Sequence, residues 1–217
     1  MFNKKGYSRT QSGAEEAANT LSHVAGLVAA VVGTPFLIVQ ASHTGGGLFV
    51  AGACVFATTI IFMYLTSSIY HFLPVGKAKH AFRVIEHSAI FLLIAGTYTP
   101  ILLGVLNGPW GWTLLAVVWS IAFVGVFLKL FAQHLPISLS TSLYLLMGWI
   151  IVVALKPLIA AMPIDGIYLL VAGGVSYSLG VIFFVLDDRL PFGHFIWHLW
   201  VLAGTTFHYF AIYWYGA

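Results

Sequence analysis

The sequence is divided into seven apolar blocks, each of which is long enough to cross a lipid bilayer. A transmembrane helix needs about 20 consecutive, mostly apolar residues. The blocks cover residues 20–41, 48–72, 84–106, 110–130, 138–158, 163–186 and 194–215. Because backbone polar groups in lipid must be satisfied within their own segment, each block is predicted to be a helix. The chain is therefore expected to be an all-α integral membrane protein, a bundle of seven transmembrane helices.

The composition excludes a soluble globular domain. Of the 217 residues, 60% are hydrophobic and only 7% are charged, whereas soluble domains are about 25% charged. The breaks between the blocks hold turn-forming residues and leave no room for a second domain. Residues 1–217 are therefore predicted to form one transmembrane domain, in which 1–19 is a polar cytoplasmic segment. The net charge of +3 is small, and we expect no nucleic-acid partner.

The basic residues predict how the bundle is oriented in the membrane. Cytoplasmic loops of membrane proteins carry an excess of Lys and Arg. With the N-terminus in the cytosol, Lys156 is the only basic residue on the outer side. The inner side then holds Lys4, Lys5, Arg9, Lys77, Lys79, Arg83, Lys129 and Arg189. We therefore expect a cytoplasmic N-terminus and a C-terminus outside.

Several ionisable side chains lie within the predicted helices, where such groups are costly and usually functional. His71 ends the second helix, Glu86 begins the third, and His194 and His198 begin the seventh. All four are therefore expected at the cytoplasmic end of the bundle. Three helices thus bring one carboxylate and three imidazoles to one layer of the membrane.

The spacing of these residues favours a metal site. His194 and His198 are four residues apart, which places both imidazoles on one helix face and suits two ligands of one zinc ion. Ser67 lies one turn before His71 on the same face. Three His ligands would leave zinc a fourth position for water, as in catalytic zinc sites. Glu86 and Ser67 are then the candidate catalytic residues, which orient or deprotonate the water and bind a substrate carbonyl.

Simpler explanations compete with the metal site. A lone His-x-x-x-His is weak evidence, and interfacial His and Glu side chains are often only solvated. Glu86 near a helix N-terminus is favoured by the helix dipole without any catalysis. Ser67 on its own is more simply bonded to a carbonyl of its own helix.

The remaining polar and small residues are given structural roles. His208 is about 15 Å beyond His198 along the helix, too far to share an ion, and His87 points away from Glu86. Solvated positions are expected for His23, His43, His80 and His134. An inner loop and no further role are expected for Asp187, Asp188 and Arg189. Helix packing is expected at Gly96, Gly104, Gly173, Gly174 and Gly180.

The runs SSIYHFLP, EHSAIFLLIAGTYTP and HFIWHLWVLAGTTFHYFA resemble bacterial hemolysin III proteins. That family is related to the adiponectin and progestin receptors and more distantly to alkaline ceramidases. The resemblance covers the whole chain and implies a multi-pass protein of the bacterial inner membrane. It also implies a zinc ion near the cytoplasmic face, held by His71, His194 and His198 with Ser67 beside them. The family usually has Asp at the position of Glu86, whose extra methylene could let the carboxylate reach the metal itself.

Three functions are compatible with the sequence. The leading hypothesis is a zinc-dependent hydrolase that cleaves an amide or ester bond of a membrane lipid at the cytoplasmic leaflet. The second is a non-enzymatic sensor of membrane lipids, in which zinc is structural and direct ligation by Glu86 is expected. The third is the pore that the name hemolysin implies, for which the sequence offers neither a continuous polar lane nor a pore-forming segment.

Overall fold

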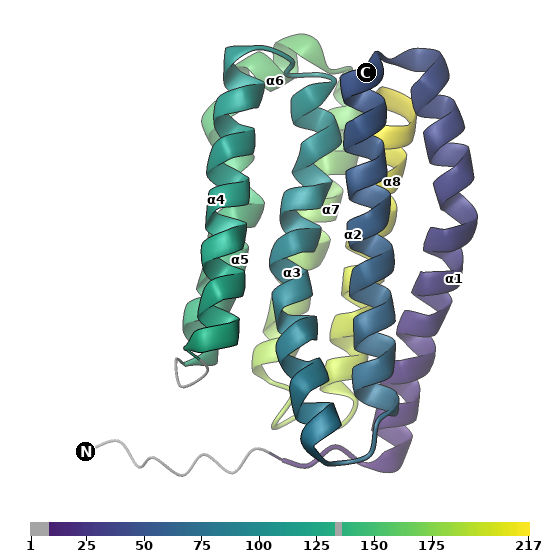
Figure 1. Cartoon of the computed structure of the whole chain (residues 1–217), viewed down its shortest axis with the longest axis vertical. Helices are drawn as coiled ribbons and strands as arrows, with labels where there is room; N and C mark the ends of the chain where they lie inside the picture. The colour runs from purple at the N-terminus through teal and green to yellow at the C-terminus, as the bar shows by residue number, and fades with distance from the viewer. Residues whose placement is uncertain (1–8, 133–135) are drawn as a thin grey trace.

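The computed structural model describes residues 9–132 and 136–217, and all the regular structure in these ranges is helical (Figure 1). Seven helical rods run along the bundle. Six of them are single helices, and the fifth consists of three consecutive helical segments. The simple rods are α1 (Gly13–Thr44), α2 (Gly47–Phe72), α3 (Lys77–Leu103), α4 (Pro109–Phe131), α7 (Ile164–Val185) and α8 (Gly193–Tyr215). The fifth rod consists of α5 (Ile137–Trp149), the 3₁₀ helix η1 (Ile150–Ala154) and α6 (Leu155–Ala161). The predicted all-α bundle is confirmed, while Lys4, Lys5 and His134 lie outside the described residues.

Six of the rods in the described ranges are long and apolar enough to cross a membrane. These are α1, α2, α3, α4, the composite fifth rod and α7. The last helix, α8, has 23 residues and is not among these six. The chain is therefore a helical membrane protein with several spans.

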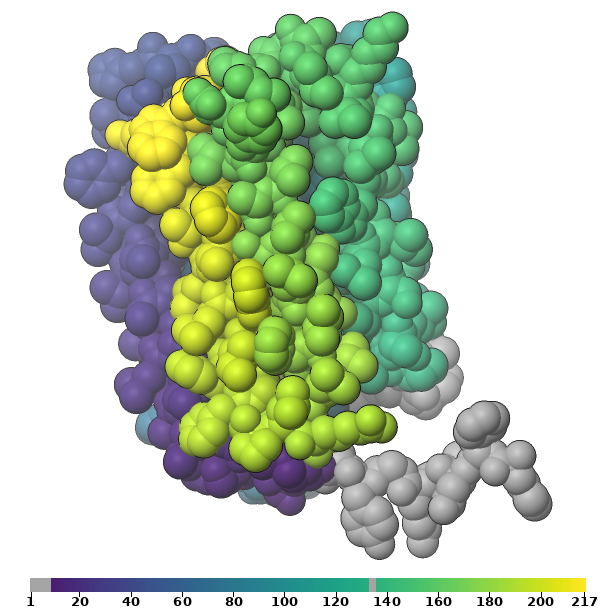
Figure 2. Space-filling view, turned by 180° about the vertical axis from the view of Figure 1, so that it is seen from behind, coloured from purple at the N-terminus to yellow at the C-terminus, as the bar shows by residue number. Residues whose placement is uncertain are grey.

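The helix α3 occupies the centre of the bundle (Figure 1). It packs against α2, α4, α5 and α8, and its most apolar stretch is the most buried of the six spans. On the other side, α7 packs on α8 and α8 packs on α1 (Figure 2). A carboxylate on α3 is therefore surrounded by neighbouring helices, and this explains the burial of Glu86.

The helix α1 begins earlier than the sequence pattern predicted. It starts at Gly13 because Ser12 and Glu15 form a capping box, in which each side chain accepts a hydrogen bond from the backbone N–H of the other. Residues 13–19, predicted to belong to the polar segment, are therefore helical. This extra length carries polar side chains of α1 to the same end of the bundle as His71.

The fifth rod is interrupted by η1, which ends three residues before Pro157. Proline lacks a backbone N–H, and its ring crowds the carbonyl four residues earlier, so the regular α-helical pattern fails in the preceding turn. Pro157 therefore accounts for the interruption of the fifth rod.

Most of the glycines that were predicted to be packing positions are crowded. A Cβ would overlap or press on neighbouring atoms at Gly96, Gly104, Gly173 and Gly180, whereas Gly174 has room for an ordinary contact. At Gly96 the obstacle is the buried side chain of Thr59, at the contact between α3 and α2.

Gly96→Ala is expected to destabilise the protein by about 1–3 kcal/mol, because overpacking a close helix contact forces backbone shifts. The matched control is Gly148→Ala, since a Cβ at Gly148 meets no atom within 4 Å. Thermal unfolding in detergent measures both variants. Equal midpoints for the two variants would contradict the close contact between α2 and α3.

Candidate metal centre

Four side chains named from the sequence meet at one end of the bundle. His71 lies in the last turn of α2, Glu86 lies on α3, and His194 and His198 lie in the first two turns of α8. All four are buried, and one ligand atom from each lies within 4.8 Å of the others. The centroids of the three imidazole rings are 4.8 to 5.0 Å apart. This group can hold a metal ion.

Each of the three histidines is held through Nδ1 and leaves Nε2 without a hydrogen-bond partner in the described part of the chain. Asn19 Nδ2 lies 3.4 Å from His71 Nδ1. The oxygen partners of Nδ1 are Glu16 Oε2 for His71 (2.8 Å), Asp187 Oδ2 for His194 (2.9 Å), and Ser22 Oγ and Asn19 O for His198 (3.0 and 3.2 Å). All of them can accept from an Nδ1–H, which leaves the Nε2 lone pair free for a ligand. Metal-binding histidines usually donate their second N–H in this way, and buried polar atoms are seldom left unpaired. The donor set therefore fits a metal.

The fourth member, Glu86, is held by a hydroxyl from α2. Ser67 Oγ donates to Glu86 Oε1 at 2.6 Å and lies 2.7 Å from His23 Nδ1. Because a carboxylate only accepts, the Ser67 proton points to Glu86, and His23 Nδ1–H donates to Ser67. Glu86 Oε1 is 3.6 Å from Nε2 of His71. Two ligands of a tetrahedral zinc lie about 3.3 Å apart, so Glu86 is close enough to become a fourth ligand.

His23 is one residue of the site that the sequence interpretation missed. It was expected to be solvated, but it is fully buried, and its ring stacks on His198 with centroids 3.5 Å apart. The error came from the start of α1, since His23 lies about three turns inside a helix that begins at Gly13. A usable signal was present, because Glu16, Asn19 and His23 are spaced three and four residues apart and share one helix face.

Comparison with known proteins places this architecture in a family. The model of the family described as "Haemolysin-III related" matches residues 12–209, from the cap of α1 into α8. The chain belongs to the haemolysin-III-related family. The resemblance inferred from its motifs is thereby confirmed, and the matched range contains every residue of the metal centre.

The relatives of this haemolysin-III-related chain cover nearly its whole length. Hemolysin-3 of Bacillus cereus is 43% identical over 206 residues, which are 95% of this chain and 94% of the relative. The Hemolysin-3 homolog of Bacillus subtilis (strain 168) is 41% identical over 201 residues, with 93% and 94% covered. The Monocyte to macrophage differentiation factor of Homo sapiens is 28% identical over 211 residues, with 91% and 83% covered. No solved structure matches the chain.

Asp187, in the loop before α8 of this haemolysin-III-related protein, contacts a residue of the metal centre. It was expected only to shape the loop, but its carboxylate binds Nδ1 of His194. The loop itself is tied to the start of α1, because Glu15 accepts from the backbone N–H of Phe192 at 2.7 Å and pairs with Arg9 at 2.6 Å. The hydrogen bond to Glu15 raises the pKa of Arg9. The N-terminal segment thus helps to fix where α8 begins.

Asp187→Ala is expected to weaken metal binding by about 10- to 100-fold, because partners of metal-binding histidines fix the ring and its tautomer. Asp188→Ala removes the same charge from the adjacent position, which does not contact the cluster, and is the matched control. Titration with zinc against a competing chelator measures both affinities. If both variants bind as tightly as the unaltered protein, the role of Asp187 is wrong.

Two other histidines lie outside the cluster, as the sequence predicted. His208 contacts the carbonyl of Gly204 in its own helix through Nδ1 at 2.8 Å, and its ring stacks on Tyr177. His87 lies beside Glu86 in sequence, but its side chain lines a separate pocket.

Proposed function

We propose that this protein is a zinc-dependent hydrolase that cleaves an amide or ester bond of a membrane lipid at the cytoplasmic leaflet. The observation that carries the proposal is that the Nε2 atoms of His71, His194 and His198 are buried, lie beside the buried Glu86, and have no hydrogen-bond partner in the described part of the chain. Imidazole is a preferred zinc ligand, and three of them with an open position are typical of catalytic zinc sites. Zinc, when bound, supplies a water whose pKa is lowered to about 7.

The residues of the chain then have distinct roles. His71, His194 and His198 would hold the metal. Glu86 would orient a water molecule and accept its proton, in the manner of a general base. Ser67 fixes the Oε1 atom of Glu86 through its hydrogen bond, which keeps the carboxylate directed toward the metal position.

An apolar cavity beside the cluster supports a lipid as the substrate. The cavity lies between α3, α5, α7 and α8, and most of its lining residues are apolar or aromatic. It begins near the metal centre, because Trp197 precedes His198 in α8 and Met63 is one turn before Ser67 in α2. Such a lining fits an acyl chain and repels a polar substrate. The excess of basic residues at this end of the bundle supports the cytoplasmic leaflet as its location.

The test is the release of fatty acid by the protein in lipid vesicles. The vesicles contain either an N-acyl sphingoid lipid or a diacyl glycerophospholipid, and free fatty acid is quantified by mass spectrometry. The proposal predicts release from one of the two substrates by the unaltered protein and none above background by His71→Ala. A His71→Ala variant that hydrolyses lipid at the full rate would refute it.

One observation favours a second function, a lipid sensor in which zinc is structural. The short distance between Glu86 Oε1 and His71 Nε2 allows four protein ligands, which would close the site to water. The Glu86 variants discussed below separate these two functions. The described residues add no support for a pore.

A further inference from the structure

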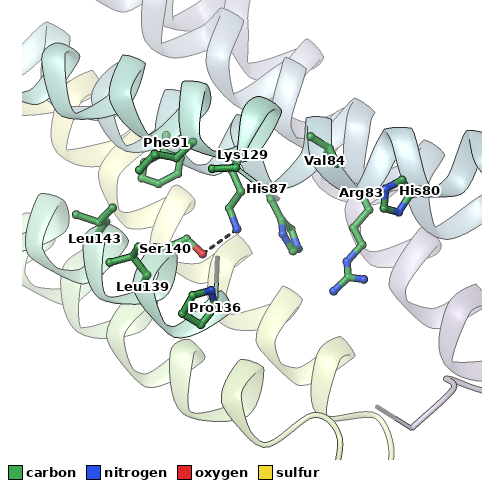
Figure 3. Close-up of a pocket in the computed structure, with 13 residues that line it drawn as sticks. His80, Arg83, Val84, His87, Phe91, Lys129, Pro136, Leu139, Ser140 and Leu143 are labelled. Carbon is green, nitrogen blue, oxygen red and sulfur yellow. Dashed lines mark hydrogen bonds between the residues drawn. The ribbon is translucent and has the colours of Figure 1, made fainter. Parts of the chain in front are cut away.

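A polar pocket lies at the same end of the bundle as the metal centre, between α3, α4 and the start of α5 (Figure 3). Its basic lining residues are His80, Arg83, His87 and Lys129. The others are Val84, Phe91, Gly125, Leu128, Ala132, Pro136, Leu139, Ser140 and Leu143. None of these residues belongs to the metal cluster, so the pocket is a separate site.

Arg83 and Lys129 give this pocket a positive charge. Its lining contains no carboxylate among the described residues, and neither Arg83 nor Lys129 forms an ion pair with a residue in the described ranges. Lys129 is half-buried and donates to the buried Ser140 Oγ at 2.8 Å, which fixes its direction and leaves two N–H groups for a ligand. Because both cations line one pocket, an anion bound there would be attracted to both of them.

The other half of the pocket is apolar. Phe91, Leu128 and Leu143 line it behind the basic groups. Gly125 lets the ring of Phe91 occupy its place in the lining, because a Cβ at position 125 would overlap that ring. A cationic opening with an apolar interior, located where the helices end, matches a headgroup with the start of its acyl chains.

We propose that this pocket binds an anionic phosphate group, held by Arg83 and Lys129. Arg presents a planar fork that suits phosphate oxygens, and Lys adds a point charge. Two sources can supply this group, namely the headgroup of an anionic phospholipid and free inorganic phosphate. The apolar half of the lining favours the phospholipid, because acyl chains can pack against these side chains and a free phosphate ion cannot.

The test is native mass spectrometry of the purified full-length protein in detergent. The probes are phosphatidylglycerol, phosphatidylcholine with the same acyl chains, and inorganic phosphate. The unaltered protein is expected to bind phosphatidylglycerol more tightly than phosphatidylcholine, whose choline cation would lie against the basic residues. The double variant Arg83→Gln, Lys129→Gln is expected to lose at least about tenfold in this affinity, since two charged hydrogen bonds are removed.

The matched control is the double variant Lys77→Gln, Arg189→Gln. It loses two exposed basic residues at the same end of the bundle but outside the pocket, and its affinity is expected to stay within about twofold, because exposed charges contribute little. If the pocket double variant does not fold, the single variant Arg83→Gln replaces it in the affinity measurement. Arg83 is exposed, so this change leaves the core of the bundle intact. The single variant is also expected to lose about tenfold.

Each outcome has one meaning. Loss of phosphatidylglycerol binding in the pocket variants alone supports the lipid headgroup as the source. Binding of inorganic phosphate but not phosphatidylglycerol, with the same dependence on Arg83, supports the free ion as the source. The proposal is overturned if the unaltered protein binds neither probe, or if the pocket variants and the control lose affinity equally.

Discussion

Glu86→Gln is expected to lower kcat/KM for lipid hydrolysis by at least about 100-fold while leaving the metal bound, since a general base contributes that much or more. Gln has the same shape, and its carbonyl oxygen can still accept the hydrogen bond from Ser67 that the carboxylate accepts now. It cannot take up a proton from water. Fatty-acid release and the metal content of the same preparation measure the two effects together.

The same variant distinguishes the hydrolase from the lipid sensor. If Glu86 is a fourth ligand of a structural metal, Glu86→Gln should weaken metal binding and stability in parallel, and the unaltered protein should show no turnover. The control is Glu86→Asp, which keeps the charge and carries the residue that the resemblance leads us to expect in this family. Under the hydrolase proposal this control retains both metal and turnover, and an inactive but fully metallated Glu86→Asp would count against Glu86 as the base.

Removal of the metal with a chelator is expected to lower the midpoint of thermal unfolding by about 10 °C. A ligand present at about 1,000 times its Kd stabilises the folded state by about 4 kcal/mol, and for a chain of this size 1 kcal/mol corresponds to about 2–4 °C. The physical cause is that a bound metal would join α2 to α8, whereas the apo site leaves the buried Nε2 atoms of His71, His194 and His198 without a hydrogen-bond partner among the described residues. Differential scanning fluorimetry in detergent measures the shift.

The control for the chelation experiment is the double variant His194→Ala, His198→Ala. It should unfold at a lower temperature than the unaltered protein and should not respond to the chelator. A midpoint of the unaltered protein that is the same with and without the chelator would show that no metal contributes to its stability.

The sequence predicted the elements of this molecule well because a bilayer imposes strong rules. Apolar length fixes the number of helices, and alternating direction then places the end of α2 beside the starts of α3 and α8. The sequence alone was therefore enough to assign His71, Glu86, His194 and His198 to one layer of the membrane. The spacing of the α8 histidines added the shared helix face.

The groups around the ligands could not be predicted in the same way. Asp187 and His23 act through contacts with residues that are distant in the sequence or lie across a turn, and no periodic pattern reports such contacts. The start of α1 was missed because hydropathy does not detect a polar first turn stabilised by a capping box. The pocket around Lys129 likewise depends on how α3, α4 and α5 pack.

The metal content of the purified protein shows whether the buried cluster of His71, Glu86, His194 and His198 binds zinc. Elemental analysis by mass spectrometry should be applied to the unaltered protein beside the double variant His194→Ala, His198→Ala. We predict about one zinc per chain in the unaltered protein and nearly none in the variant, because three imidazoles are needed for a stable site. An unaltered protein free of metal, or a double variant that retains one zinc per chain, would show that this cluster is not the zinc site.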